Sequence, residues 1–174
     1  MKSASYPPAV SRSVRPRQKM EIHYPTGQIQ HIPHTFLNDL PQSFHIYTQY
    51  LPNEGVVAYA RHVKAAAATM IATAATEFEE LKSVADAESW LIALDACKCH
   101  LEVGEFDDMM SALDALDIAL EAADDIPDGT YESIRVYIDE WRDSACARYK
   151  KYVEFVEYID TAAAHGCFAI INSH

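Results

Sequence analysis

The sequence predicts a mainly α-helical protein: an antiparallel four-helix bundle with one very long C-terminal helix and a small N-terminal β-hairpin. Three observations favour this class. Apolar residues recur at steps of three and four along four long stretches, which is the period of a helix with one buried face. Short connections separate these stretches, so neighbouring helices are expected to run antiparallel. Hydrophobic residues make up 49% of the 174 residues, enough to build a folded core.

The last of these stretches, residues 130–165, is the longest. An apolar stripe follows it throughout, and neither Pro nor Gly interrupts it. Asp128 or Thr130 is expected to cap its start, and Gly166 is expected to end it. At 1.5 Å per residue, an unbroken helix would be about 54 Å long, which exceeds the width of a small domain. We therefore expect it to bend, to break near residues 143–144, or to project towards another chain.

Three earlier stretches predict the remaining helices of the bundle. Their expected bounds are residues 53–81, 83–103 and 106–125. Asn53 and Ser83 are the expected caps of the first two, because their side-chain oxygens accept bonds from unpaired backbone amides. Gly104 is expected to end the second helix and Pro127 the third. The first is rich in alanine, which lets neighbouring helices approach closely.

Shorter elements are expected before and after the bundle. Residues 20–32 predict a β-hairpin, because apolar residues alternate on both sides of a turn at residues 25–27. Residues 41–51 fit either a helix or a strand, and we favour the helix. The apolar tail is expected to form a short strand beside the hairpin or to enter the core. We divide the single domain, residues 20–174, into residues 20–52 (hairpin and short elements), 53–166 (helix bundle) and 167–174 (tail).

Charge is distributed unevenly along the chain. The formal net charge is −12, yet residues 1–19 are basic and rich in Pro and Ser. We expect a flexible arm there. It is either disordered or lies on the protein's own acidic body, or else it docks on an acidic partner or on nucleic-acid phosphates. Its candidate binding residues are Arg12, Arg15, Arg17 and Lys19. The remaining chain is acidic enough to repel nucleic acid and anionic membranes, so direct nucleic-acid binding is not favoured.

Acidic side chains recur at helical spacing along residues 106–125 and just beyond. They are expected on one side of the helix, away from its leucines. The candidate binding residues are Asp107, Asp114, Asp117, Glu121, Asp124, Asp125 and Asp128. Such a stripe either keeps the protein in solution or binds a partner with a basic surface. In its extreme form, it would imitate the phosphate backbone of a nucleic acid.

Cysteine and histidine residues raise the alternative of metal binding or catalysis. Cys97, Cys99 and His100 are zinc ligands by type. On a helix, however, Cys97 and Cys99 lie about 200° apart, so they cannot both reach one ion. We therefore expect Cys97 in the core and Cys99 near the surface. A second group, in the N-terminal third, comprises His23, His31, His34 and His45. Because no motif for catalysis or cofactor binding accompanies them, we predict no catalytic residue, metal site or cofactor.

The turn at residues 101–108 resembles the interhelical turn of a tetratricopeptide repeat. Gly104, Phe106 and Pro127 stand where such repeats favour a glycine, an aromatic residue and a proline. The likeness covers about 25 residues, no second copy follows, and Pro127 comes late for a period of about 34 residues. The resemblance does not extend to family membership. It implies a role in binding peptides or proteins.

These patterns favour a non-catalytic intracellular interaction protein: an adaptor, an inhibitor or an assembly subunit. It would act through the acidic helical surface and the long helix at residues 130–165. That helix is a plausible route to a homo-oligomer because it carries five tyrosines, a residue type common at interfaces. They are Tyr131, Tyr137, Tyr149, Tyr152 and Tyr158.

Two alternatives remain. One is an acidic nucleic-acid mimic that inhibits a DNA- or RNA-binding protein, as anti-restriction and anti-CRISPR proteins do. The other is an enzyme or metal-binding protein whose histidines and cysteines meet on folding. No apolar run is long enough to span a membrane and no secretory signal is visible, so a cytoplasmic location is expected.

Overall fold

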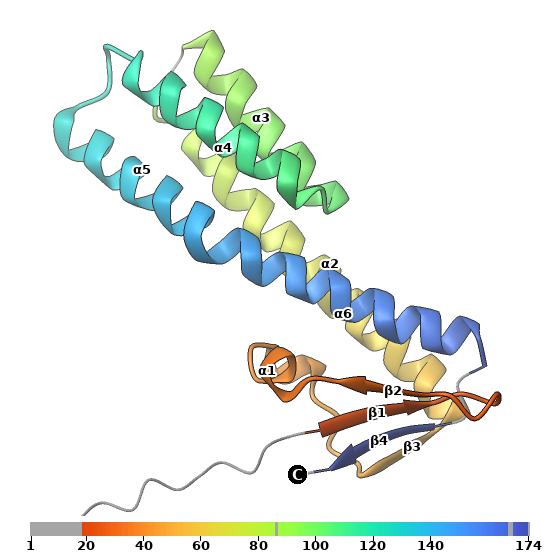
Figure 1. Cartoon of the computed structure of the whole chain (residues 1–174). Coiled ribbons are helices and arrows are strands. Elements are labelled where there is room, and N and C mark those ends of the chain that lie inside the picture. Colours follow the sequence, from red (N-terminus) through yellow and green to blue (C-terminus); the bar gives the residue numbers. More distant parts are fainter. Residues whose placement is uncertain (1–18, 86, 167–168, 174) are drawn as a thin grey trace, which may run out of the picture.

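The computed structural model describes residues 19–85, 87–166 and 169–173. Helices extend from one end of an elongated molecule to a small antiparallel sheet at the other (Figure 1). In chain order the elements are β1 (Lys19–His23), β2 (Ile29–Ile32), α1 (His34–Leu37), a 3₁₀ turn (Gln42–Phe44), β3 (Tyr50–Pro52), α2 (Asn53–Leu81), α3 (Glu88–Val103), α4 (Phe106–Glu121), α5 (Asp128–Glu140), a π-helical segment (Trp141–Ala145), α6 (Cys146–Ala164) and β4 (Ala169–Ser173). The predicted mainly helical class with a small N-terminal sheet is confirmed.

The sheet joins both ends of the described chain. Its strand order is β2-β1-β4-β3, and every neighbouring pair is antiparallel. β1 and β2 form the predicted hairpin around Gly27, whose φ of 82° favours glycine. β4 lies between β1 and β3, with Ile170 opposite Ile22 and Leu51. Of the two expectations for the tail, the strand beside the hairpin is therefore the correct one.

The helix that we favoured for residues 41–51 is wrong. Only a 3₁₀ turn forms there, and Tyr50 opens β3. Phe44 is buried because its ring packs against Tyr152 and Phe155, with centroids 5.5 and 5.8 Å away. The strand that follows pairs with β4, more than a hundred residues later. Both partners are distant in sequence, so local periodicity could not reveal them.

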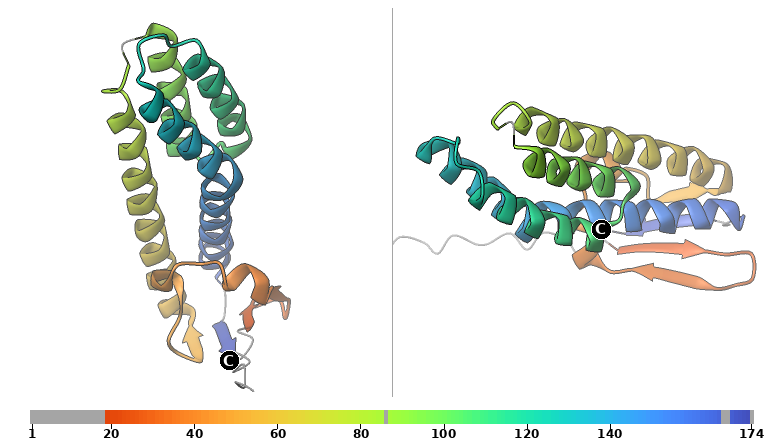
Figure 2. Two further views of the ribbon diagram at one scale, coloured as in Figure 1. Left: turned by 90° about the vertical axis from the view of Figure 1, so that its left-hand side faces the viewer. Right: turned by 90° about the horizontal axis from the view of Figure 1, so that it is seen from above.

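α2 has the predicted bounds and spans both halves of the molecule. It packs against α6 on the side of the sheet and against α3 further along (Figures 1 and 2). Asn53 is not its cap: the helix begins at that residue, Pro52 precedes it, and no side-chain capping bond forms. α2 has 29 residues, whereas α3 and α4 have 16 each. The α3–α4 hairpin therefore flanks only one end of α2.

Two boundaries of the α3–α4 hairpin differ from prediction. α3 begins at Glu88 rather than Ser83, whose Oγ instead donates to the Glu80 carbonyl at 2.8 Å. The intervening chain turns so that Ala85 enters the core, which overrides the local capping signal. α4 ends at Glu121 rather than residue 125, and Pro127 precedes α5 rather than closing α4. Gly104 ends α3 as predicted.

The predicted helix at residues 130–165 consists of α5, the π-helical segment and α6. It starts at Asp128 after Pro127, so neither Asp128 nor Thr130 is the cap. The π-helical segment includes residues 143–144, where a break was one of the three outcomes that we expected. Such a segment holds one more residue per turn than an α-helix and changes the direction in which later side chains point. At the far end, Gly166 has a φ of 64°, as expected of a residue just beyond a helix.

Two hydrophobic cores lie at the two ends of the molecule. The first is enclosed by the end of α2 with α3, α4 and α5, and Trp90, Leu94, Leu113 and Ile138 lie at its centre. The second is enclosed by the sheet, α1, the start of α2 and α6, with Ile22, Phe44, Val63 and Phe155. Tyr149 packs against both cores. The α3–α4 hairpin thus belongs to one core and the sheet to the other.

Candidate protein-binding groove

The turn at the end of the α3–α4 hairpin rests on α6. Gly104 forms this turn with a φ of 75°, and a Cβ at this position would lie 3.8 Å from a Val153 methyl. Past the turn, α2 and α6 continue without the hairpin towards the sheet (Figure 1). Beyond the end of the hairpin, α2 and α6 alone therefore form the surface. A hollow lies on each side of the contact between Gly104 and Val153.

The first hollow has a volume of about 360 Å³ and lies between α4 and α6. Its lining contains five carboxylates and one lysine. The lining residues are Gly104, Glu105, Phe106, Asp107, Asp108, Lys150, Val153, Glu154 and Glu157. Lys150 pairs with Asp107 at 3.3 Å. Four carboxylates lie outside that pair, so the hollow carries a clear negative charge.

The second hollow, of about 380 Å³, lies between α2 and α6 beside the end of α3. Small and apolar side chains form its floor, and charged residues stand at its margin. It is lined by Lys64, Ala67, Ala68, Ile71, Ala72, Glu102, Val153, Val156 and Glu157. Because Val153 and Glu157 line both hollows, the two adjoin. We call them together the α6 groove.

Helical spacing explains why these residues meet. Val153, Val156 and Glu157 are three and four residues apart, so they lie on one face of α6. On α2, Ala67 and Ile71 are likewise separated by four residues. Their neighbours are alanines, which leave space between the two helices that larger side chains would fill. The acidic hollow next to this space forms because the first turn of α4 lies over α6.

Much of the predicted acidic stripe is already paired within the protein. Arg142 contacts Asp114 at 3.2 Å and Asp117 at 3.7 Å, and Lys150 contacts Asp107. The stripe on α4 therefore faces the basic residues of the π-helical segment and α6 rather than solvent alone. Asp107 also lies in the first turn of α4, where a negative charge complements the helix dipole. A structural role accounts for these three acids.

The other predicted acidic residues gather at the opposite end of α4. Glu121 is its last residue, Asp124 and Asp125 lie in the following turn, and Asp128 begins α5. All four are exposed. They are separated from Asp107 by the length of α4, so the seven candidates extend from the first turn of α4 to the start of α5.

The basic arm falls almost entirely outside the described residues. Arg12, Arg15 and Arg17 belong to that part of the chain. Lys19 does not belong to an arm, because it is the first residue of β1 and pairs with Ser173 of β4. The boundary predicted at residue 19 is therefore too late.

The cysteines of α3 lie where the helical geometry predicts. Cys97 is fully buried, and burial raises the pKa of its thiol from 9.0 to about 12. Cys99 is exposed. Burial also raises the pKa of the Cys146 thiol, which donates to the Phe106 carbonyl at 3.6 Å. A thiol in this state is a poor nucleophile, because the thiolate is the reactive form.

Of the N-terminal histidines, the structure brings two together. His23 and His31 lie on either side of Glu21, at 3.1 and 3.5 Å from its two carboxylate oxygens. His31 is the cross-strand neighbour of Glu21. His34 instead begins α1, and His45 contacts the Leu40 carbonyl.

The helical stretch that we considered as a route to an oligomer packs its apolar stripe within the chain. Ile134, Ile138 and Trp141 are buried in the first core. Most of the tyrosines are likewise engaged: Tyr149 stacks on Trp141 at 5.6 Å, and Tyr152 is buried against Phe44. Any self-association would need other residues of these helices.

Sequence reasoning missed the groove residues on α6. Glu154 and Glu157 are spaced as neighbours on one helix face, with Val153 and Val156 beside them. This spacing is visible in the sequence itself. It could not show that the first turn of α4 would lie opposite, because this depends on where the π-helical segment directs α6.

Comparison with known proteins supplies no relative: no family model matches the chain, and neither a curated protein nor a solved structure does so. Among the described residues, the helices are all too short or too polar to cross a membrane.

Proposed function

We propose that the chain is a non-catalytic interaction protein that binds a basic, amphipathic segment of a partner protein in the α6 groove. The observation that supports this is the junction of an acidic hollow with an apolar one along α6. A segment with Lys or Arg beside apolar side chains would match both hollows at once. An adaptor, an inhibitor or an assembly subunit would each use such a surface.

The charges favour a basic partner. Asp108, Glu154 and Glu157 line the acidic hollow without a partner among the ion pairs described, and Glu105 contacts His100 at 3.1 Å rather than a lysine. The net charge of −12 adds a negative field over the whole molecule. Complementary charge accelerates association and favours one class of partner, whereas apolar burial supplies more of the affinity.

The apolar hollow supplies the buried apolar area that adds to the affinity. Alanines with Ile71, Val153 and Val156 line it, and its volume of about 380 Å³ can receive an aliphatic side chain of a partner. Burying apolar area stabilises a complex by about 25 cal/mol per Å² before the cost of association is subtracted. The two hollows adjoin at Val153 and Glu157. A helical segment suits this arrangement, since such segments present apolar and charged faces side by side.

The test uses a fluorescent synthetic helix with Lys and Leu at helical spacing, and fluorescence anisotropy measures its binding to the full chain. We expect saturable binding that weakens as salt rises, because exposed charges are screened. Replacing the two acids that α6 contributes to the acidic hollow, Glu154→Lys and Glu157→Lys, should reduce the affinity at least about ten-fold, a loss of roughly 1.4 kcal/mol. Val156→Asp should weaken binding by placing a charge in the apolar hollow.

The matched control is the double variant Glu132→Lys with Glu140→Lys, which makes the same charge change at two exposed positions on α5. It should leave the affinity nearly unchanged. Equal losses in the control and the groove variants would show that only the general charge matters. Equal binding of an acidic peptide with the same leucines would also refute the proposal.

The nucleic-acid mimic predicts a different result. It requires the exposed acids at the α4–α5 turn, so Glu121→Gln, Asp124→Asn and Asp125→Asn together should abolish binding to a basic nucleic-acid-binding protein. Groove binding should survive these changes. The internal pairing of Asp107, Asp114 and Asp117 leaves the mimic fewer free charges than the sequence suggests.

A further inference from the structure

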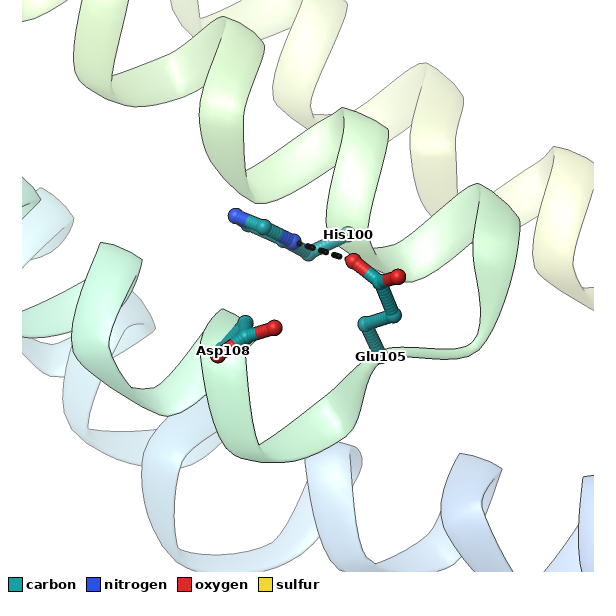
Figure 3. A group of neighbouring side chains, drawn as sticks. All are labelled: His100, Glu105 and Asp108. Atoms are coloured by element: carbon teal, nitrogen blue, oxygen red, sulfur yellow. Dashed lines mark hydrogen bonds and ion pairs between the residues drawn. The ribbon is translucent and has the colours of Figure 1, made fainter.

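Three potential metal ligands meet at the α3–α4 turn. His100 comes from the last turn of α3, Glu105 immediately precedes α4, and Asp108 lies in the first turn of α4. One ligand atom from each lies within 4.8 Å of the other two. Figure 3 shows the imidazole and the two carboxylates arranged around a common space.

The backbone fixes the relation between these side chains. Gly104 adopts the left-handed conformation, and the Glu105 amide donates to the His100 carbonyl at 2.9 Å. The His100 ring nitrogen Nδ1 is consequently 3.1 Å from Glu105 Oε2. His100 is also partly buried, which restricts its motion. The two atoms are therefore already adjacent, and a bound cation would replace the proton that they share.

We propose that His100, Glu105 and Asp108 bind a divalent cation of the zinc type. Zinc lies about 2.0–2.2 Å from imidazole nitrogen and carboxylate oxygen, so tetrahedral ligand atoms are about 3.3–3.5 Å apart. The His100–Glu105 distance is close to that value. The Asp108 ligand atom, which lies within 4.8 Å of the other two, reaches this spacing by a change of side-chain rotamer. Water or a partner's side chain would complete the coordination.

The ligand set determines which cation fits. Calcium and magnesium favour sites made only of oxygen ligands, whereas an imidazole with two carboxylates suits zinc or a similar transition metal. The turn also has a simpler explanation, namely a His–Glu ion pair with acids at a helix N-terminus. The ion-pair explanation needs no cation and gives Asp108 no interaction with His100. The metal site, by contrast, requires Asp108 as a ligand.

The test is isothermal titration of the full chain with zinc chloride in a non-chelating buffer near pH 7.5. We expect one saturable site whose affinity falls on acidification, because zinc binds neutral imidazole. His100→Ala and Asp108→Asn should each weaken binding at least about ten-fold, since loss of an outer-shell group alone costs about that much. No partner protein is needed, so the result does not depend on the proposed groove function.

Control variants distinguish zinc binding at this site from zinc binding by other side chains. Asp107→Asn and Glu102→Gln change neighbouring exposed acids outside the triad and should leave the zinc affinity unchanged. Cys99→Ser tests binding through the exposed thiol on α3. Circular dichroism verifies that the variants fold, and Asp108 is exposed, so its amide should be tolerated. The proposal fails if the wild type shows no stoichiometric site, if Asp108→Asn binds like the wild type, or if Cys99→Ser abolishes binding.

Discussion

Arg142 donates a hydrogen bond from Nε to the carboxylate of Asp114 at 3.2 Å and so links the π-helical segment to α4. The same guanidinium contacts Asp139 at 2.8 Å and Asp117 at 3.7 Å. One cation therefore separates three carboxylates that would otherwise repel one another. This arrangement also explains why an acidic stripe can stand against another helix in a protein with so high a negative charge.

We expect Arg142→Gln to destabilise the protein by about 1 kcal/mol, because a partly exposed network of ion pairs contributes modestly. The loss should be larger at low salt, where the carboxylates repel one another more strongly. Urea denaturation at two salt concentrations measures it. Arg148→Gln is the control, since Arg148 is exposed on the same helical stretch and forms none of the ion pairs described above. Equal stability losses in both variants would contradict a specific role for Arg142.

Trp141 connects α2 to the last helical stretch. Its ring lies 4.9 Å from Phe78 and stacks on Tyr149, and it is only 4% exposed. Trp141→Ala should lower the free energy of unfolding by about 3–5 kcal/mol through lost contacts and a cavity. Thermal or urea denaturation measures this loss. Val136→Ala, at a position 61% exposed on α5, should change stability by no more than about 0.5 kcal/mol.

The buried Cys97 thiol should make stability depend on alkaline pH. Burial raises its pKa from 9.0 to about 12 in the folded protein. Below pH 9 the thiol keeps its proton in both the folded and unfolded states, so it adds no pH dependence. Between these values the unfolded chain releases the proton and the folded chain retains it, so the free energy of unfolding falls as pH rises.

Denaturation at several values between pH 8 and 11 would measure this slope. Cys97→Ala should be less stable at neutral pH but should lose less stability on raising the pH. Some slope should remain, because burial also raises the pKa values of Tyr59 and Tyr137. An unchanged slope in Cys97→Ala would contradict the assignment.

The elements predicted correctly are those whose signals are local. α2 was predicted from Asn53 to Leu81 because its alanines and apolar stripe repeat over many turns. The core residues of α4, such as Leu113 and Leu116, follow from the same period. Signals read from single residues were less reliable. Ser83 and Asn53 are good caps by type, yet neither caps a helix here.

Contacts between distant segments account for the remaining differences. Strand β3 forms because β4 pairs with it, and the sequence around Tyr50 contains no trace of that partner. The acidic stripe was located correctly on α4, but its pairing with Arg142 depends on how two helices face each other. For the same reason, Glu105 and Glu157 could not be recognised as members of one hollow.

The π-helical segment determines how α6 is rotated about its axis relative to α5, and so how the two ends of the molecule fit together. In an α-helix, removal of one residue rotates everything beyond it by about 100°. A single-residue deletion within Trp141–Ala145 would keep the contacts between α3 and α4 but turn Tyr152 and Phe155 away from Phe44. It would also turn Glu157 away from the first turn of α4. The number of residues in this short segment consequently fixes how α6 faces both the sheet and the groove. Insertions or deletions there should be tolerated far less than in the exposed turns.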